Sequence, residues 1–316
     1  MMSVAYLIRR LLQAIIVVIG VSIIVFVMVH SLPGGPARAI LGPQATPIQV
    51  KDFIVANGYN KPLIVQYFNY LGQLLHGNLG YSYTENAPVR TLIGQALPKT
   101  ALLVFLAYGL GLIVGVPLGI WQAVHRDGAL DHALTSVELT GYSMPLFWLG
   151  LLLIDGLAIG LHLFPPQGPQ GPTISASFSD PVALVLPVVT LMITVFGSFA
   201  RFARSAALDS LAQDYIRTAR AKGLTRRQVL TRHVLRNSLL PLISLIGLIL
   251  PLVIAGALVV EQVFNYPGMG LLFWNSAIAR DYPVVMGVAM VVAVATVLGS
   301  LLADILYRFA DPRVSY

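Results

Sequence analysis

The sequence contains no cysteine and few charged residues, and each of these shortages excludes a class of protein. A chain without cysteine forms no disulfide, has no thiol nucleophile and offers no cysteine ligand to a metal. Charged residues occupy 10% of the 316 positions, whereas they occupy about a quarter of a typical soluble domain. Together with 57% hydrophobic residues and a mean hydropathy of +0.79, this shortage of charge indicates an integral membrane protein.

The common catalytic motifs are missing as well. The sequence has no His-Glu-x-x-His zinc helix and no Gly-x-Ser-x-Gly nucleophile elbow, and its six histidines are scattered. It also lacks the Gly-x-x-x-x-Gly-Lys-Ser/Thr loop that cradles phosphates, so this chain cannot be an ATPase by that route. We therefore expect a protein that is not an enzyme by itself.

Glu138 and Asp155 are carboxylates within or beside an apolar segment, where an ionisable group is costly. Two interpretations stay open: a functional group inside the membrane, and a carboxylate in the interfacial zone. On one straight helix the two residues would lie roughly 25 Å apart along the axis, so they could not form a catalytic pair within one chain.

Six stretches of the sequence are apolar and long enough to cross a membrane as helices. The first follows Arg9 and Arg10. Because its apolar core is longer than that of a secretory signal and no small-x-small cleavage site follows, we expect a retained helix. The predicted spans cover about residues 11–29, 100–123, 134–161, 182–200, 239–260 and 283–306.

The predicted fold is therefore an all-α integral membrane protein with six transmembrane helices. Its parts are a head with the first span (1–31), a long extracytoplasmic region (32–98) and a five-helix core (99–316), which contains a basic loop between helices 4 and 5 (201–238). Nine of the twenty Lys and Arg residues lie in this loop, and fourteen lie on that side of the membrane in total. Because loops rich in Lys and Arg stay in the cytosol, we expect the loop and both termini there. This distribution accounts for the net charge of +7 without a nucleic-acid partner.

Two patterns predict how helices pack. Ala107, Gly111, Gly115 and Gly119 recur at every fourth position of the second span, so another helix can approach closely, either from the same chain or from a partner. Between residues 62 and 76 the apolar positions recur with helical spacing, which predicts a helix that rests on other protein or on the membrane interface.

The basic loop has a helical pattern of its own. We expect helical turns over about residues 206–222, ended by Gly223 because glycine readily takes the left-handed conformation of a helix C-terminus. A second helical piece that carries Arg226 and Arg227 follows. On this pattern alone the loop is either a docking structure for a partner or a solvated basic loop that only orients the spans.

Residues 214–224 read Asp-Tyr-Ile-Arg-Thr-Ala-Arg-Ala-Lys-Gly-Leu and closely resemble the signature loop of binding-protein-dependent ABC importer permeases, in the form found in dipeptide, oligopeptide and nickel importers. The resemblance continues at residues 61–67, 77–80, 259–264 and 266–270 and at the tail, 310–313. It therefore covers nearly the whole chain, and it matches the first of the two permease subunits that such importers normally use.

The resemblance implies a division of labour among several chains. A second permease subunit would share the membrane pathway, two cytosolic ATPase subunits would use ATP and Mg, and an extracytoplasmic solute-binding protein would deliver the cargo. This chain itself would need no cofactor. It would lie among the lipids of the plasma (inner) membrane of a bacterium or archaeon.

The resemblance also assigns an ATPase-docking loop. Ala219 and Gly223 match the alanine and glycine of the family motif. Arg217 and Thr218 depart from its usual Glu-Ala, so docking carries over but the individual contacts do not. The implied docking residues are Asp214, Arg217, Thr218, Ala219, Lys222 and Gly223.

Glu261, Phe264 and Tyr266 follow the predicted fifth span on the outer side, near the surface where the resemblance places the binding protein. We expect them at an outer gate or in contact with that protein. For Glu261, a structural carboxylate at the end of a span is an alternative.

The cargo is the least specified property. Peptides are the cargo that the resemblance favours, with nickel complexes, glutathione or sugars as alternatives for the same type of importer. A cavity lined by Tyr142, Ser143, Met144 and Trp148 would be permissive rather than selective. An ATP-independent secondary transporter is the alternative from a different class, although the internal repeats that are common in such proteins are not evident.

Overall fold

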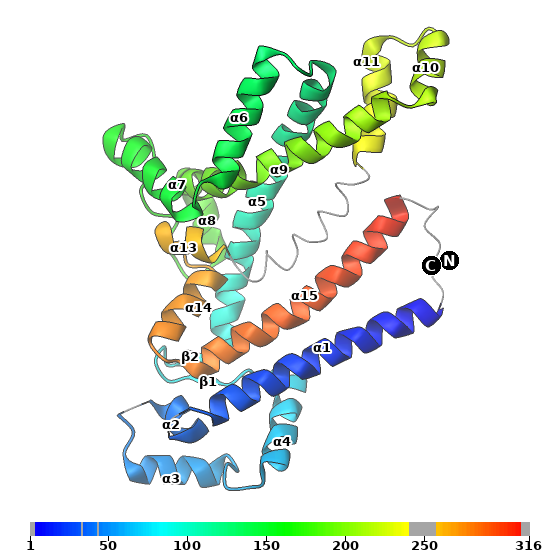
Figure 1. Ribbon diagram of the computed structural model, residues 1–316. Coiled ribbons are helices and arrows are strands. Elements are labelled where there is room, and N and C mark those ends of the chain that lie inside the picture. Colours follow the sequence, from blue (N-terminus) through cyan, green and yellow to red (C-terminus); the bar gives the residue numbers. More distant parts are fainter. Residues whose placement is uncertain (1–3, 33, 43, 240–256, 311–316) are drawn as a thin grey trace.

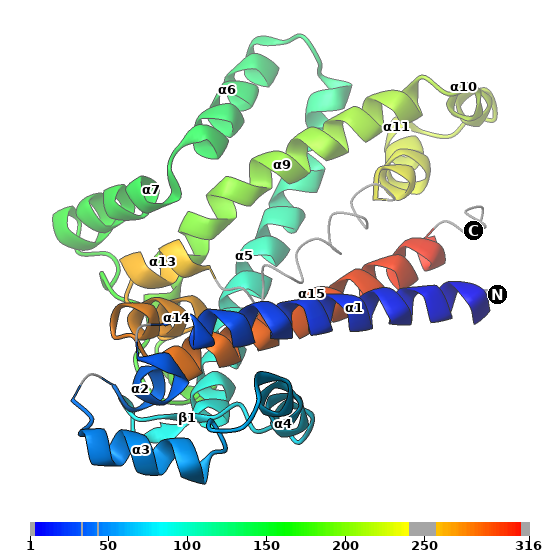
Figure 2. The same ribbon diagram turned by 60° about the horizontal axis from the view of Figure 1, so that its bottom comes forward.

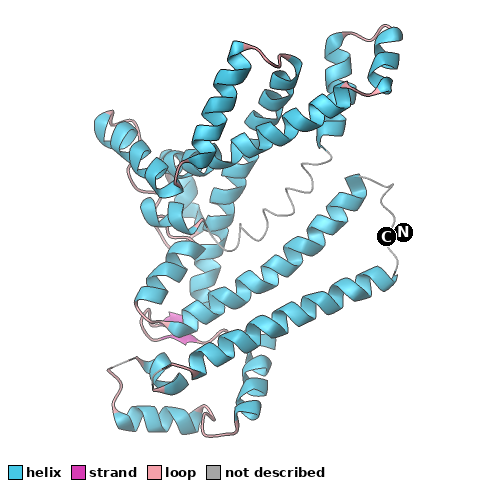
Figure 3. Cartoon of the chain, viewed as in Figure 1, coloured by secondary structure: helices cyan, strands magenta, loops and turns pink. Residues whose placement is uncertain are grey.

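A computed structural model describes residues 4–310 apart from 33, 43 and 240–256. Within these ranges the protein is mostly helical, as predicted (Figure 3). The described strands are β1 (Tyr81–Ser82) and β2 (Ala87–Pro88), which pair antiparallel in a small hairpin.

Four described segments are long and apolar enough to cross a membrane, and they confirm the predicted first, second, fourth and sixth spans. The predicted fifth span, about residues 239–260 with Pro241 and Pro251, lies almost wholly outside the described residues. The four segments are formed by α1 (Val4–His30), α5 (Val89–Val124), η2 with α9 (Val182–Leu184, Val185–Leu211) and α15 (Tyr282–Ala310).

The predicted third span is wrong as a single straight helix. The structure has α6 (Ala129–Ser143) and then α7 (Leu146–Leu153) with the π-helix η1 (Ile154–Gly160), and the two parts are bent by 106°. The cause is Pro145: a residue before proline is disfavoured in the helical region, and Met144 is extended with φ −72° and ψ 131°.

Glu138 and Asp155 consequently lie on two different helices, α6 and η1, so the axial separation expected for one straight helix does not apply. Glu138 is buried, with 1% of its surface exposed, whereas Asp155 is exposed.

The region after the first span folds into short helices and the β-hairpin. The predicted amphipathic helix at 62–76 is confirmed as α4, and the second span begins earlier than expected, since α5 starts at Val89. The short helices α2 (Gly35–Leu41), α3 (Pro47–Ala56) and α4 (Leu63–Leu75) lie together at this end of the molecule, and α14 (Met269–Ile278) lies above α2 (Figure 2). The short helix α8 (Ile174–Ser179) lies beside α7 and α9 (Figure 1).

The small-residue stripe of α5 packs against α9 of the same chain. A Cβ atom added to Gly115 would lie 2.6 Å from the carbonyl oxygen of Phe196, and one added to Gly119 would lie 2.1 Å from that of Ala200. The two backbones therefore nearly touch, and residue numbers rise together along the contact, so both helices run in the same direction (Figure 1). This finding decides between the two alternatives: the stripe is occupied within the chain and is not open to a second subunit.

The long helices place the start of α1 and the end of α15 on the same side of the molecule as the basic loop. α1 and α15 lie side by side and run in opposite directions. The start of α1, the end of α15, and α10 (Asp214–Ala221) with α11 (Arg226–Val229) all lie toward the right in Figures 1 and 2, whereas α2 and α3 lie toward the opposite end. This arrangement is the one expected if both termini and the basic loop share one side of the membrane.

The α5–α9 contact predicts opposite effects at two glycines of α5. We expect Gly119→Ala to lower the free energy of unfolding by about 1–3 kcal/mol, because the new methyl group meets backbone atoms that cannot easily move. Gly109→Ala should leave stability equal or slightly higher, since nothing lies within 4 Å of a Cβ there. Thermal unfolding of both variants in detergent, followed by size-exclusion chromatography, measures the difference, and equal melting temperatures would contradict this packing.

Candidate functional site

The basic loop forms a compact structure of two helical pieces, which we call the knob (residues 214–234). It consists of α10, α11 and the π-helix η3 (Leu230–Val234). Ile216 and Ala219 point inward from α10 at three-residue spacing and are buried, with 1% and 5% of their surfaces exposed. The knob therefore has a buried apolar side.

The corner between the two pieces is fixed by the backbone around Gly223. Its φ of +83° is left-handed, as predicted. The Leu224 N–H donates to the Ala219 carbonyl at 3.2 Å and the Gly223 N–H donates to the Arg220 carbonyl at 2.9 Å, which together form a Schellman motif.

A capping box starts the second piece immediately after this corner. The Thr225 hydroxyl accepts from the Gln228 N–H at 3.3 Å, and the Gln228 side-chain oxygen accepts from the Thr225 N–H at 2.9 Å. The sequence from Lys222 to Gln228 thus encodes the stop of one helix and the start of the next.

The structure divides the predicted docking residues into an outer and an inner group. Asp214, Arg217, Thr218 and Lys222 are exposed, whereas Ala219 lies on the buried apolar side of the knob. Arg217 and Asp214 form an ion pair at 3.3 Å, and both side chains are more than four-fifths exposed, at 82% and 92%. Because an exposed pair of this kind contributes little to stability, its charges are available to a partner.

The knob is anchored to the long helices through contacts that sequence reasoning did not find. The buried residues Ile216 and Ala219 belong to one apolar cluster with Ala123, from the last turn of α5, and Ala207, from the last turns of α9. A displacement of the knob would therefore act directly on the ends of both helices.

Tyr215 adds a polar anchor. Its hydroxyl shares a hydrogen bond with Ser210 Oγ at 2.7 Å, and it accepts one from the side-chain amide of Asn237 at 2.9 Å. This tyrosine thereby joins α9 to the segment that leads toward residue 240. Nothing in the periodicity of the sequence distinguishes it from its exposed neighbours.

Buried polar side chains join α6 to α5 and α9. Asp131 forms an ion pair with Arg204 at 2.6 Å, and the amide of Gln122 donates to Thr135 at 3.5 Å. Glu138 is buried nearby along α6, and Gly197 of α9 leaves room for the backbone of this residue to approach. The burial of Glu138 counts against a carboxylate exposed at the membrane interface, and a functional role for this group stays a prediction.

A second group of polar contacts, which we call the outer cluster, surrounds Glu261 at the opposite end of α5. One carboxylate oxygen accepts from the Thr100 hydroxyl at 2.6 Å and the other accepts from the Leu271 N–H at 3.0 Å. The Thr100 oxygen in turn accepts from the Met269 N–H at 2.7 Å. A Cβ on Gly268 would lie 2.4 Å from the Thr100 hydroxyl oxygen, so the glycine is needed for this close approach.

Tyr266 and Phe264 extend the outer cluster toward the loop that precedes α8. The Tyr266 hydroxyl donates to the Lys99 carbonyl at 3.0 Å, and the Phe264 carbonyl accepts from the Gly168 N–H at 2.7 Å. Burial raises the pKa of the Tyr266 phenol to about 12, so the group remains a hydrogen-bond donor at neutral pH.

The three predicted outer residues are therefore brought together, but none lies on the surface. Glu261 in α13 (Leu258–Val263), Phe264 and Tyr266 are all fully buried, with 0% of their surfaces exposed. A binding protein could not touch these side chains in this conformation, so their burial favours the structural alternative for Glu261. A role at an outer gate stays a prediction.

The described residues contain no group of three or more His, Asp or Glu side chains that could hold a metal ion. Tyr142 and Trp148, which we expect to line a permissive cavity, are exposed on either side of the bend at Pro145. The Arg201 guanidinium lies 4.5 Å from the centre of the Tyr142 ring, so Trp148 offers the open aromatic surface at the break between α6 and α7.

Comparisons with known proteins match the whole length of the chain. The family model "Binding-protein-dependent transport system inner membrane component" matches residues 115–316, and the corresponding N-terminal model matches residues 2–104. The oligopeptide transport system permease protein AppB of Bacillus subtilis is 40% identical over 314 residues, which cover 99% of each chain. The dipeptide transport system permease protein DppB of Escherichia coli is 34% identical and covers 98% of each chain.

A putative peptide transport system permease protein of Brucella melitensis is 38% identical over the full length of both chains. Among solved structures, a chain from inward-facing conformations of the MetNI methionine ABC transporter superposes with a TM-score of 0.49 and 16% identity, over 70% of this chain and 96% of that chain.

The outer cluster predicts that Glu261→Ala destabilises the protein. The Thr100 hydroxyl and the Leu271 N–H would lose their acceptor inside the protein, at a cost of about 1–3 kcal/mol for each group left unpaired. Thermal unfolding in detergent should show a lower melting temperature. Glu85→Ala removes an exposed acid from the β-hairpin loop and serves as the control.

A double-mutant cycle with Thr100→Val tests the contact itself. The two changes should be less than additive, because each removes the same hydrogen bond. Strict additivity would show that Glu261 and Thr100 do not interact.

Proposed function

The chain belongs to the family of binding-protein-dependent transport system inner membrane components, and we propose that it forms, with a second permease subunit, the membrane pathway of an ATP-driven importer for peptides. The observation that carries this proposal is the knob. It presents exposed charged side chains on one face, and its other face is packed against the ends of two helices that cross the membrane.

The exposed face of the knob suits docking to a cytosolic ATPase subunit. Asp214, Arg217 and Lys222 offer charges of both signs, and the Schellman corner at Gly223 holds α10 in place without using these side chains. Two such ATPases, one on each permease, would bind ATP with Mg and hydrolyse it. This chain contributes no catalytic group to that reaction.

The coupling follows from the anchors of the knob. When ATP draws the two ATPases together, each knob is displaced with its ATPase. Because Ile216 packs beside Ala123 and Ala207, the displacement is passed to α5 and α9 as a pair. The nearly touching backbones of these two helices resist sliding, so they move together and reorient the pathway.

The opposite end of the molecule would face an extracytoplasmic solute-binding protein. In this orientation the knob and both termini lie in the cytosol, and α2, α3 and α4 form the outer surface. α4 carries large exposed apolar side chains, among them Ile64 and Phe68 at 72% and 66% exposure, which suit contact with protein or lipid at the membrane edge.

Peptides are the proposed cargo because the relatives that span the full chain are named as oligopeptide, dipeptide or peptide permeases. The exposed aromatic side chain of Trp148 carries no charge and fits a pathway that accepts many side chains. Nickel complexes, glutathione and sugars are the cargoes that direct uptake assays have to exclude.

Replacement of Gly223 tests the docking role. We expect Gly223→Trp to abolish ATP-dependent uptake and the co-purification of ATPase subunits, because a side chain at a φ of +83° costs about 1–2 kcal/mol and places a bulky group at the corner of α10. The measurements are peptide uptake into vesicles with and without ATP, and mass spectrometry of the complex purified in mild detergent.

Gly77→Trp is the matched control. Gly77 also has a left-handed φ, +72°, and like Gly223 has nothing within 4 Å of a Cβ, but it follows α4 in the region assigned to the outside. It should retain the ATPases. Loss of the ATPases in both variants would show general misfolding, whereas uptake by the parent protein without nucleotide would favour a secondary transporter and refute the proposal.

A further inference from the structure

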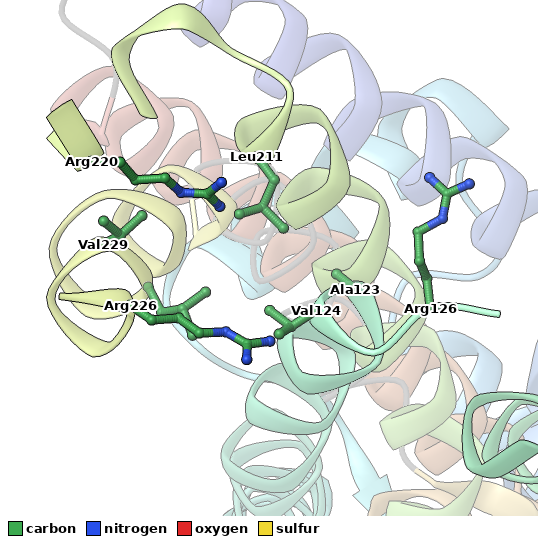
Figure 4. A pocket seen from close by; sticks show the side chains of 8 residues that line it. Ala123, Val124, Arg126, Leu211, Arg220, Arg226 and Val229 are labelled. Carbon is green, nitrogen blue, oxygen red and sulfur yellow. The ribbon is translucent and has the colours of Figure 1, made fainter. Parts of the chain in front are cut away.

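Two cavities meet where the knob joins the ends of α5 and α9. The first, of about 230 Å³, lies between the last turns of these helices and the knob, and Arg220 and Arg226 extend their guanidinium groups into it (Figure 4). Its remaining wall is largely apolar and includes Ala123, Val124 and Leu211.

The two arginines have no acceptor within the described part of the chain. The guanidinium groups of Arg220 and Arg226 form no hydrogen bond or ion pair with any described residue. Arg126 at the rim of the same cavity differs, since it pairs with Asp127 at 3.0 Å. Two guanidinium groups that line one cavity without a counter-charge form a site for an anion, and their planar forks suit the oxygens of a phosphate.

The second cavity, of about 340 Å³, continues the first along α5. The two share Val124, Arg226 and Leu230 in their walls. From there the second is lined mainly by apolar side chains, among them Pro117, Ile120 and Leu235. It therefore provides an apolar groove along a helix that crosses the membrane, with positive charge at the end nearest the knob.

Trp121 indicates where this groove lies relative to the membrane surface. It lines the second cavity, is 37% exposed and lies in the last turn of α5, just before His125 and Arg126. Tryptophan followed by basic residues at the end of a span is the pattern of the membrane interface. In the orientation proposed above, this pattern puts the arginine pair on the cytosolic side of Trp121, toward the lipid phosphates, and puts Pro117 and Ile120 toward the acyl chains.

We propose that these joined cavities bind one anionic phospholipid of the cytosolic leaflet, with its phosphate between Arg220 and Arg226 and an acyl chain along Trp121 and Ile120. The inference rests on the proposed function for the orientation of the knob. A carboxylate from an ATPase would match the charge of the arginines but not the apolar groove that continues from them, whereas a phospholipid matches both.

A lipid bound there would fill the space between the knob and α5 and connect the two. Arg220 belongs to α10, Arg226 to α11 and Val124 to α5, so one bound molecule contacts all three elements on which coupling depends. The anionic lipid would then help to hold the knob against α5 while the knob transmits movement to the membrane helices.

Tryptophan fluorescence tests the site in the full chain. Trp148 and Trp274, which are 47% and 41% exposed, are replaced by Phe, so that Trp121 is the remaining tryptophan. The protein is placed in phosphatidylcholine vesicles that contain brominated phosphatidylglycerol or, at the same mole fraction, brominated phosphatidylcholine. We expect stronger quenching by the anionic lipid, with a preference in relative affinity on the order of fivefold for each arginine.

Paired substitutions decide whether the preference is local. Arg220→Gln with Arg226→Gln should abolish it, whereas Arg220→Lys with Arg226→Lys should retain most of it because lysine also binds phosphate as a point charge. The control, Arg227→Gln with Arg232→Gln, removes the same charge from exposed positions that line neither cavity, and it should keep the preference. Unchanged quenching by phosphatidylcholine shows that each variant is folded.

Three results would overturn the proposal: equal quenching of the parent by both lipids, equal loss of preference in the Gln pair and the control pair, or an unchanged lipid preference in a Gln pair that no longer co-purifies with ATPase. The last result would assign the arginines to an acidic partner surface. Because the quenching assay contains no ATPase, a failure of the proposed function would appear separately, as an absence of ATP-dependent uptake.

Discussion

The contact between α5 and α9 is the constraint on which both functional regions depend. Three glycines of α5 let its backbone approach that of α9 so closely that a single methyl group at Gly119 has no room. A contact between backbones cannot be relieved by a change of rotamer, unlike one between side chains. The pair therefore behaves as one rigid strut, and the knob and the outer cluster are attached at its two ends.

The two ends of the strut are built by different physical means. At the knob, apolar packing of Ile216 and Ala219 joins short helices to α5 and α9, and the exposed face remains free. At the outer cluster, a buried carboxylate is bound by the Thr100 hydroxyl and a backbone N–H, so the loop around Glu261 has a defined geometry. The knob keeps an exposed face that a partner can bind, whereas hydrogen bonds fix the geometry of the outer cluster.

Much of this could be predicted from the sequence, because hydropathy and glycine conformation are local properties. The described spans follow from apolar length, and the end of α10 follows from Gly223. Apolar length predicts a span but not a change of direction within it, so the bend between α6 and α7 follows only from Pro145. The burial of Glu261 could not be predicted, since its partner Thr100 is 161 residues away, and Tyr215 likewise gave no local signal.

The corner at Gly223 has a consequence for how related systems stay separate within one cell. Its hydrogen bonds run between main-chain groups, so its shape does not depend on which side chains α10 presents outward. Asp214, Arg217 and Lys222 can change in charge or size without altering the scaffold that displays them. If α10 binds an ATPase subunit as proposed, a duplicated copy of this chain can change its ATPase partner by surface substitutions on α10 that leave the corner intact.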